Sequence, residues 1–189
     1  MPCTINRAKP SDYRDIVSIY SLANETLTLD ARLSDTAQEA LLASLEEEIE
    51  SEHVFIVRED YKAVAFAIVE RNLEDAFFPS TRSFSKANEL LDAIDHTGEN
   101  VMAIRAIYVA ANHQRKKIGT DLLRSLFGRY KDSSWLLWNI EKNVGTTRFF
   151  LENGFVILEQ DFHVELEEKP LLVLCRKYRP TGLCREAFW

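Results

Sequence analysis

The sequence has few cysteines, and their placement suits neither a disulfide framework nor a metal site. Its 189 residues include three, Cys3, Cys175 and Cys184, which are widely spaced and odd in number. We therefore predict no metal site and place Cys175 in the core. No apolar run is long enough for a signal peptide or a membrane span, so we expect no membrane partner and a cytoplasmic location.

The chain also lacks internal repeats and low-complexity stretches that would divide it. With 46% hydrophobic residues it can bury an ordinary core, and we predict a single domain over residues 1–189. Acidic residues are in excess, and the formal net charge is −7. This excess argues against nucleic acid as a partner and is compatible with a cationic acceptor.

The basic residues concentrate just after the middle of the chain. Ile104–Val109 is an apolar stretch typical of a strand, Gln114–Thr120 is a basic turn with a glycine, and a helical pattern follows directly. Because the first N–H groups of a helix lack internal partners and carry partial positive charge, such a turn can bind a phosphate. The alternative is a basic turn and helix that only face solvent.

A second strand and helix follow this unit. Ser134–Ile140 reads as a strand, and the segment from Asn143 reads as a capped helix that ends before Phe155. Asn143 can accept a hydrogen bond from an early helix N–H, and Gly154 can adopt the left-handed conformation that closes a helix.

Together the two units resemble the GCN5-related N-acetyltransferase (GNAT) family. The family's pyrophosphate loop, Arg/Gln-x-x-Gly-x-Gly/Ala, corresponds to residues 114–119, except that Lys117 replaces the first glycine. The later signature, an Asn followed by a helix ending in aromatic-x-x-x-Gly-Phe, matches Asn143, Phe150, Gly154 and Phe155. The resemblance covers most of the chain in element order and is detailed only over residues 101–155.

The sequence pattern predicts the element order β-αα-βββ-α-β-α-ββ, which is the order this family uses. The resemblance then implies the α/β (α+β) class and the GNAT acyl-CoA N-acyltransferase fold, with a mixed central sheet of about seven strands flanked by helices. Strands are expected at 3–7, 54–58, 63–71, 104–109, 134–140, 155–165 and 171–178. Glu167–Pro170 is expected to connect the last two strands, and Asp35 with Gln38 to form a capping-box variant.

The resemblance implies direct transfer of an acyl group, usually acetyl, from acetyl-CoA to a small-molecule or protein amine. The pantetheine would insert between the fourth and fifth strands, and the pyrophosphate would lie on the basic turn. The coenzyme-binding residues that this implies are Ile107, Tyr108, Val109, Gln114, Arg115, Lys116, Lys117, Ile118, Gly119, Thr120, Asn143 and Phe150.

The chain departs from the family pattern where catalysis is concerned. Many members place a tyrosine four residues before the glycine of Gly-Phe, where it protonates the leaving thiolate, and this chain has Phe150. Members that acetylate ribosomal-protein N-termini carry a carboxylate base five residues before the asparagine, and this chain has Trp138. We therefore assign no catalytic residue. Candidates are Glu70, Glu99 and Glu141 for the base and Tyr108 for a substitute hydroxyl, against the alternative that they are solvated or packed.

The segment 72–100 is rich in carboxylates and would attract an amine if it covered the acceptor site. The alternative is a solvated surface helix, predicted around Ser83–Ile94, whose preceding phenylalanines pack inward. Two functions stay open beside the transferase: a coenzyme-binding module without turnover, and an interaction protein without a nucleotide site. The tail from Tyr178 would pack on its own core or in a homodimer interface.

Overall fold

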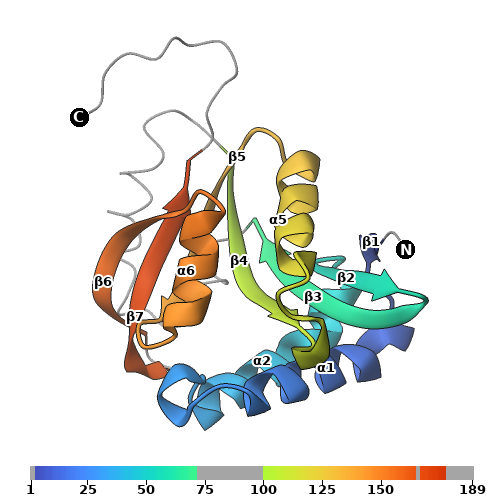
Figure 1. Cartoon of the computed structure of the whole chain (residues 1–189), viewed down its shortest axis with the longest axis horizontal. Helices are drawn as coiled ribbons and strands as arrows, with labels where there is room; N and C mark the ends of the chain where they lie inside the picture. The colour runs from blue at the N-terminus through green and yellow to red at the C-terminus, as the bar shows by residue number, and fades with distance from the viewer. Residues whose placement is uncertain (1–2, 72–99, 165–166, 178–189) are drawn as a thin grey trace.

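The computed structural model describes residues 3–71, 100–164 and 167–177, and these residues form a single mixed sheet with helices on both faces (Figure 1). The strands are β1 (Thr4–Arg7), β2 (Val54–Glu59), β3 (Lys62–Glu70), β4 (Asn100–Val109), β5 (Ser133–Ile140), β6 (Val156–Val164) and β7 (Glu167–Arg176). The helices are α1 (Tyr13–Glu25), α2 (Asp35–Glu50), α5 (Ile118–Arg129) and α6 (Val144–Glu152). None of them has both the length and the apolar content that a membrane crossing needs.

The seven strands lie in the order β1-β2-β3-β4-β5-β7-β6. Neighbouring strands run antiparallel except β4 and β5, which are parallel because α5 connects them across one face. The predicted fold class and element order are thus confirmed. The strand ends differ from prediction by a few residues, which is the usual uncertainty of such boundaries.

Each face of the sheet carries its own hydrophobic core. One core packs Ile16 of α1 and Leu45 of α2 against Ile56 and Phe66 of the sheet. The other packs the buried leucines of α5 and Phe150 of α6 against the opposite face. Figure 1 shows α5 and α6 side by side on one face, with α1 and α2 running along the lower edge. The central strands are buried on both sides, which explains their nearly continuous apolar sequences.

Two local predictions were wrong. Ser34, and not Asp35, is the N-cap of α2, since its hydroxyl accepts a hydrogen bond from the Ala37 N–H at 3.2 Å. Residues 167–170 are not a connection but the start of β7. The proline there is tolerated because the ladder needs only its carbonyl: Pro170 O accepts from the Glu141 N–H at 3.0 Å.

A β-bulge interrupts β4 at Arg105. In the pairing with β3, Val69 lies opposite Ile104 and Ile68 lies opposite Ala106, so Arg105 has no residue across from it. The extra residue shifts the alternation of side chains by one. Ile104 faces the α5 side, Ala106 faces the α1 side, and Ile107 faces the α5 side again.

The strands β4 and β5 part directly at this bulge. Their pairing runs from Asn100 opposite Ser133 to Ile104 opposite Leu137 and then ends. Beyond it, β4 stays paired with β3 as far as Val109, and β5 stays paired with β7 as far as Ile140. Each strand therefore keeps its hydrogen bonds to its other neighbour, β3 or β7, while a gap opens between β4 and β5.

The cap of α2 gives a test of this local structure. Replacing Ser34 with Ala should lower the free energy of unfolding by about 1 kcal/mol, because an early helix N–H loses its acceptor. Urea unfolding would measure the loss. Asp35→Asn, which keeps the cap and removes only a helix-end charge, should cost at most about 0.5 kcal/mol. The reverse ranking would restore Asp35 as the capping residue.

Candidate functional site

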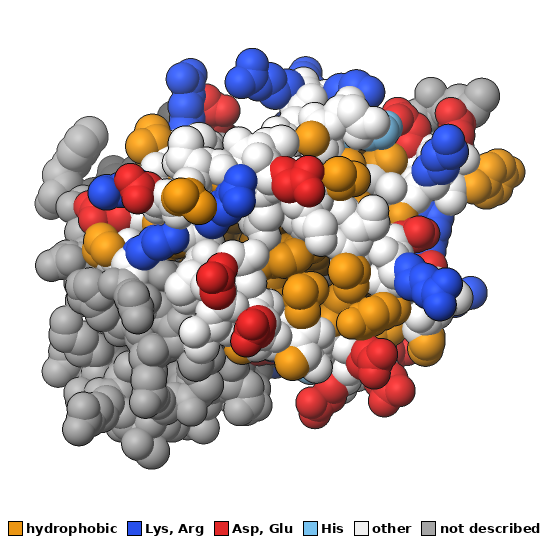
Figure 2. All heavy atoms as spheres, turned by 90° about the horizontal axis from the view of Figure 1, so that it is seen from below, with side chains coloured by type: hydrophobic (Ala, Val, Ile, Leu, Met, Phe, Trp, Pro, Cys, Tyr) orange, Lys and Arg blue, Asp and Glu red, His pale blue; other side chains and the backbone are white. Residues whose placement is uncertain are grey.

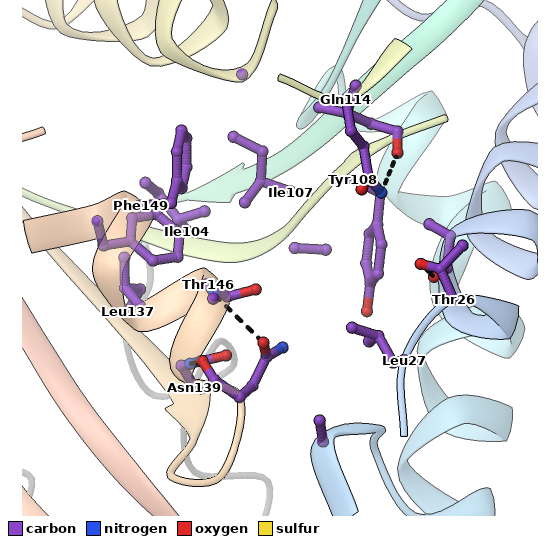
Figure 3. A pocket seen from close by; sticks show the side chains of 18 of the residues that line it. Thr26, Leu27, Ile104, Ile107, Tyr108, Gln114, Leu137, Asn139, Thr146 and Phe149 are labelled. Carbon is purple, nitrogen blue, oxygen red and sulfur yellow. Dashed lines mark hydrogen bonds between the residues drawn. The ribbon is translucent and has the colours of Figure 1, made fainter. Parts of the chain in front are cut away.

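The gap between β4 and β5 is part of a cavity of about 630 Å³. Five parts of the chain line it: the end of α1 with the segment after it, β4, the turn before α5, β5, and α6 with the residues before it. Figure 3 shows Ile104, Ile107, Leu137 and Phe149 together on one side, and Tyr108, Thr26 and Leu27 on the other. The cavity therefore joins the gap to the basic turn and to the α1 side in one space.

The basic turn is built with left-handed backbone at two positions that are not glycine. Lys117, the residue before α5, has φ 66° and ψ 3°, and Arg115 has φ 61°. Such conformations cost an ordinary residue roughly 1 kcal/mol or more, which is why glycine is favoured there. The family's first glycine thus corresponds to a conformational requirement, and Lys117 meets it at a cost in strain.

This conformation leaves the first N–H groups of α5 facing the turn. The first internal contact of the helix is the Asp121 N–H to Lys117 O bond of 2.9 Å, so the N–H groups of Ile118, Gly119 and Thr120 precede the helical ladder. Gln114 closes the other end, since its side-chain amide donates to Val109 O at 3.2 Å (Figure 3). The turn can therefore present N–H groups and positive charge to an anion.

Gly119 serves close packing at this point. A Cβ built on it would lie 3.2 Å from Cζ of Phe149 and 3.6 Å from Cγ2 of Val109. Both neighbours line the cavity. The glycine thus lets the first turn of α5 approach α6 and the end of β4.

A hydrogen-bond network fixes the entry to α6. Asn143 is the predicted N-cap, and its Oδ1 accepts from the Thr146 N–H at 3.2 Å. Asn139 of β5 donates to Thr147 Oγ1 at 2.9 Å and to Asn143 O at 3.2 Å. Gly154 has φ 88°, the left-handed value predicted for the helix end. The network ties α6 to the end of β5 that is no longer paired with β4.

The structure brings together the residues predicted for coenzyme binding, with one exception. The cavity is lined by Ile107, Tyr108, Val109, Gln114, Arg115, Lys117, Ile118, Gly119, Thr120, Asn143 and Phe150. Lys116 is exposed on the same turn but does not line the cavity. Phe150 is 2% exposed and packs against Phe155 at a ring distance of 5.2 Å, so its ring belongs mainly to the core.

Sequence reasoning missed several residues of the wall. Asn139, Thr146 and Phe149 line the cavity from β5 and α6, and Asn24, Thr26, Leu27 and Leu33 line it from the α1 side. Asn139 carried a usable signal, because an amide in an apolar strand needs a polar partner. The residues after α1 carried no such signal, since their sequence is that of an ordinary loop.

The charged lining of the cavity is uneven. Arg115 and Lys117 stand at the turn, and Arg105, whose charge is paired with Glu48 and Glu70, lines the cavity from β4, whereas the described residues on the α1 side are uncharged. Among the described lining residues the only carboxylate is Glu152, which pairs with Arg148 at 2.8 Å. Figure 2, viewed from below Figure 1, shows hydrophobic side chains gathered around a hollow, and basic side chains along the upper margin of the molecule. An anion is thus favoured at one end only.

Tyr108 is a wall residue packed between aromatic rings. Its ring lies 5.0 Å from that of Tyr20 and stacks on Phe66 at 5.5 Å. Burial, and secondarily the nearby Tyr20, raise the pKa of the Tyr108 hydroxyl above its ordinary value of 10.0. The hydroxyl therefore keeps its proton at neutral pH and can donate a hydrogen bond into the cavity but cannot act as a base.

The carboxylates proposed as bases lie elsewhere. Glu70 is 4% exposed, does not line the cavity, and forms an ion pair of 2.7 Å with Arg105, which does line it. Burial, with the neighbouring Glu48 carboxylate, raises the pKa of Glu70 to about 7, although Arg105 acts in the opposite direction. Glu141 does not line the cavity either, and Glu99 lies outside the described residues.

One group of side chains has metal-ligating chemistry. Glu48, His53 and Glu70 offer ligand atoms within 4.8 Å of one another. The guanidinium of Arg105 contacts both carboxylates and already supplies positive charge between them. The group is thus better explained as a buried ion cluster than as a cation site.

Glu70→Gln tests the raised pKa through stability. In the unfolded chain the carboxyl ionises near its ordinary pKa of 4.5, whereas the folded chain retains the proton to about 7. Ionisation therefore favours the unfolded state as pH rises through this window. The substitution should stabilise the protein more at about pH 8 than at about pH 5 in urea unfolding. Glu47→Gln, at an exposed site on α2, should show no such difference, and equal behaviour of the two variants would reject the shift.

The model of the acetyltransferase (GNAT) family matches residues 16–155. No curated protein matches the sequence significantly. The fold is similar to a GNAT-family acetyltransferase from Bacillus cereus, with 16% identity, a TM-score of 0.64, and coverage of 95% of this chain and 100% of that one.

Two further structures share the fold. One is the PaiA N-acetyltransferase of Thermoplasma acidophilum in complex with coenzyme A, with 14% identity, a TM-score of 0.63, and coverage of 94% and 100%. The other is the ribosomal-protein-S18-alanine N-acetyltransferase of Escherichia coli, with 15% identity, a TM-score of 0.61, and coverage of 97% and 99%. The family match spans most of the chain, and the described fold agrees with it: the chain belongs to the acetyltransferase (GNAT) family.

Proposed function

We propose that the protein is an acetyl-CoA-dependent N-acetyltransferase that passes the acetyl group directly to an amine. The observation that carries this proposal is the continuity of one cavity from the basic turn into the gap between β4 and β5. A long, narrow ligand with an anionic end fits that shape and charge. Calorimetry with coenzyme A, together with thiol release over a panel of amines, tests it.

The residues present fit the coenzyme. The N–H groups at the start of α5, with Arg115 and Lys117, suit the pyrophosphate. The edge of β4 that turns away from β5 between Ile107 and Val109 offers backbone donors and acceptors to the amide groups of pantetheine. Ile104, Leu137 and Phe149 form an apolar wall where the chain of the coenzyme would pass (Figure 3).

Acetyl transfer in such a site forms a C–N bond and breaks the C–S bond of the thioester. The amine gives up a proton, and the leaving thiolate takes one. An ordinary amine with pKa near 10.4 needs roughly 4–5 kcal/mol to reach its neutral form at pH 7. In this proposal a backbone N–H near Val109 would stabilise the oxyanion of the tetrahedral intermediate. The described carboxylate in the cavity, Glu152, is paired with Arg148, and both ring nitrogens of His113 have hydrogen-bond partners, so water is the proposed first acceptor of the amine's proton.

We propose an amine that is cationic in solution as the acceptor. The acid excess of the chain is the support for this, and the carboxylate-rich segment that would recruit the amine lies outside the described residues. On the described α1 side, Thr26, Leu27 and Tyr108 would contact the body of the acceptor (Figure 3).

A coenzyme-binding module without turnover is the second candidate. It is favoured by Phe150, which has no proton to give to the leaving thiolate and lies mostly in the core. Thiol release that never exceeds the rate without amine, in a chain that binds coenzyme A, would support this candidate over the transferase.

Gly119→Val tests the proposed coenzyme site. The new side chain would push against Phe149 and Val109 and narrow the cavity, so the affinity for coenzyme A should fall about tenfold or more, or roughly 1.4 kcal/mol. Gly128→Val is the matched control, because it lies on the same helix and a Cβ there meets no atom within 4 Å. Unchanged affinity in a folded Gly119 variant would reject the site.

Phe150→Tyr tests whether leaving-group protonation limits turnover. Because Phe150 lines the cavity, a hydroxyl on its ring can reach the ligand space, and we expect faster thiol release at saturating amine with unchanged coenzyme affinity. A hydroxyl buried without a partner would instead lower the free energy of unfolding by about 1–3 kcal/mol. That loss, without a gain in rate, would contradict the expectation.

A further inference from the structure

We propose that Arg105 is a positioning residue for the coenzyme: its buried ion cluster holds the bulge of β4 and so maintains the gap between β4 and β5. The inference rests on the proposed function, because it takes the gap as the coenzyme site. Nothing in the sequence motif marks Arg105, which lies outside the turn and the α6 signature.

The location of Arg105 is the first support. It is the residue directly after Ile104, the last residue of β4 that pairs with β5. It is also the residue without a counterpart in the ladder with β3. The bulge and the parting of the strands therefore coincide at one position.

The contacts of Arg105 are the second support. Its Nη1 donates to Glu48 of α2 and to Glu70 of β3, the latter at 2.7 Å, and its Nη2 lies 3.2 Å from Ser44 Oγ of α2. The side chains of Glu48 and Glu70 are 9% and 5% exposed. One guanidinium thus joins the bulge to a helix and to the neighbouring strand.

The consequence of losing these contacts is specific to the gap. A strand pair without a bulge is regular, and a one-residue slip in register turns every following side chain to the other face. Beyond Arg105 such a slip would turn Ile107 and Val109 away from the α5 side, where they now pack. The backbone N–H and C=O groups of β4 that are proposed to bind the coenzyme would change direction with these side chains. The half-buried Arg105 prevents the slip, because any other register would leave the buried carboxylates of Glu48 and Glu70 unpaired in the interior.

Lysine cannot fully replace arginine in this role. The guanidinium reaches the two carboxylates and the serine hydroxyl with separate N–H groups in a fixed plane, whereas an ammonium concentrates its donors at one atom. Arg105→Lys should retain part of the function and Arg105→Met little of it.

The test compares the affinity of these variants for coenzyme A with that of the unchanged chain by calorimetry at a temperature where all are folded. We expect Arg105→Met to bind about tenfold or more weakly and Arg105→Lys to fall between it and the unchanged chain. The matched control is Leu41→Ala on α2, which destabilises the same core, keeps the backbone carbonyl that accepts from Ser44 Oγ, and should bind coenzyme A normally. Hydrogen exchange should show lost protection in β4 beyond Arg105 in the Met variant and not in the control.

The outcomes separate the two proposals. Failure of the unchanged chain to bind coenzyme A overturns the proposed function and this inference with it. Normal binding by the unchanged chain and by folded Arg105→Met overturns the inference alone. An equal loss of affinity in Leu41→Ala also overturns it, because general destabilisation would then explain the effect.

Discussion

The structure depends on a pair of strands that begin together and then separate. Backbone N–H and C=O groups in the interior need partners, so neighbouring strands normally stay paired to their ends. Here the pairing of β4 with β5 ends at Ile104 and Leu137, before either strand ends. The sheet tolerates the separation because each strand keeps its other neighbour, β3 on one side and β7 on the other. The backbone edges inside the gap are then available to a ligand instead of a strand.

The surroundings of the gap follow from this constraint. α5 follows β4 after the basic turn, and the left-handed Lys117 turns its first N–H groups toward the opening. α6 follows β5 after three residues, and Asn143 and Asn139 fix its start. Gly119 lets the two helices meet across the gap, since its lack of a side chain leaves room for Phe149. The basic turn and the α6 signature, far apart in sequence, are therefore two walls of one space.

The sequence predicted the fold and the two walls because both are local patterns. A strand, a basic turn with a glycine and an amphipathic helix can be recognised as consecutive segments of the sequence, and so can Asn143 and Gly154 at the ends of α6. The β-bulge could not be recognised from the sequence. Arg105 sits in an apolar strand, and its acidic partners are 57 and 35 residues earlier in the chain. The α2 cap was missed for a simpler reason, since Ser34 and Asp35 are both good capping residues and only the backbone decides between them. That residues 1–189 form one domain stays a prediction.

Binding and chemistry are separable in this chain. The groups suited to hold the coenzyme are backbone N–H groups, exposed cations and packed apolar side chains, and none of these needs a particular protonation state. Among the described residues, the groups that could move protons are held apart from the gap, kept protonated or already partnered: Glu70 by its cluster with Arg105, Tyr108 by burial, and His113 by Glu59 and Asn112. A thiolate is a good leaving group once the tetrahedral intermediate has formed, so the step that most needs help is removal of the amine's proton. Because the described wall supplies no unpaired carboxylate, the rate of such an enzyme would follow the fraction of neutral amine, and it would rise with pH below the amine's pKa.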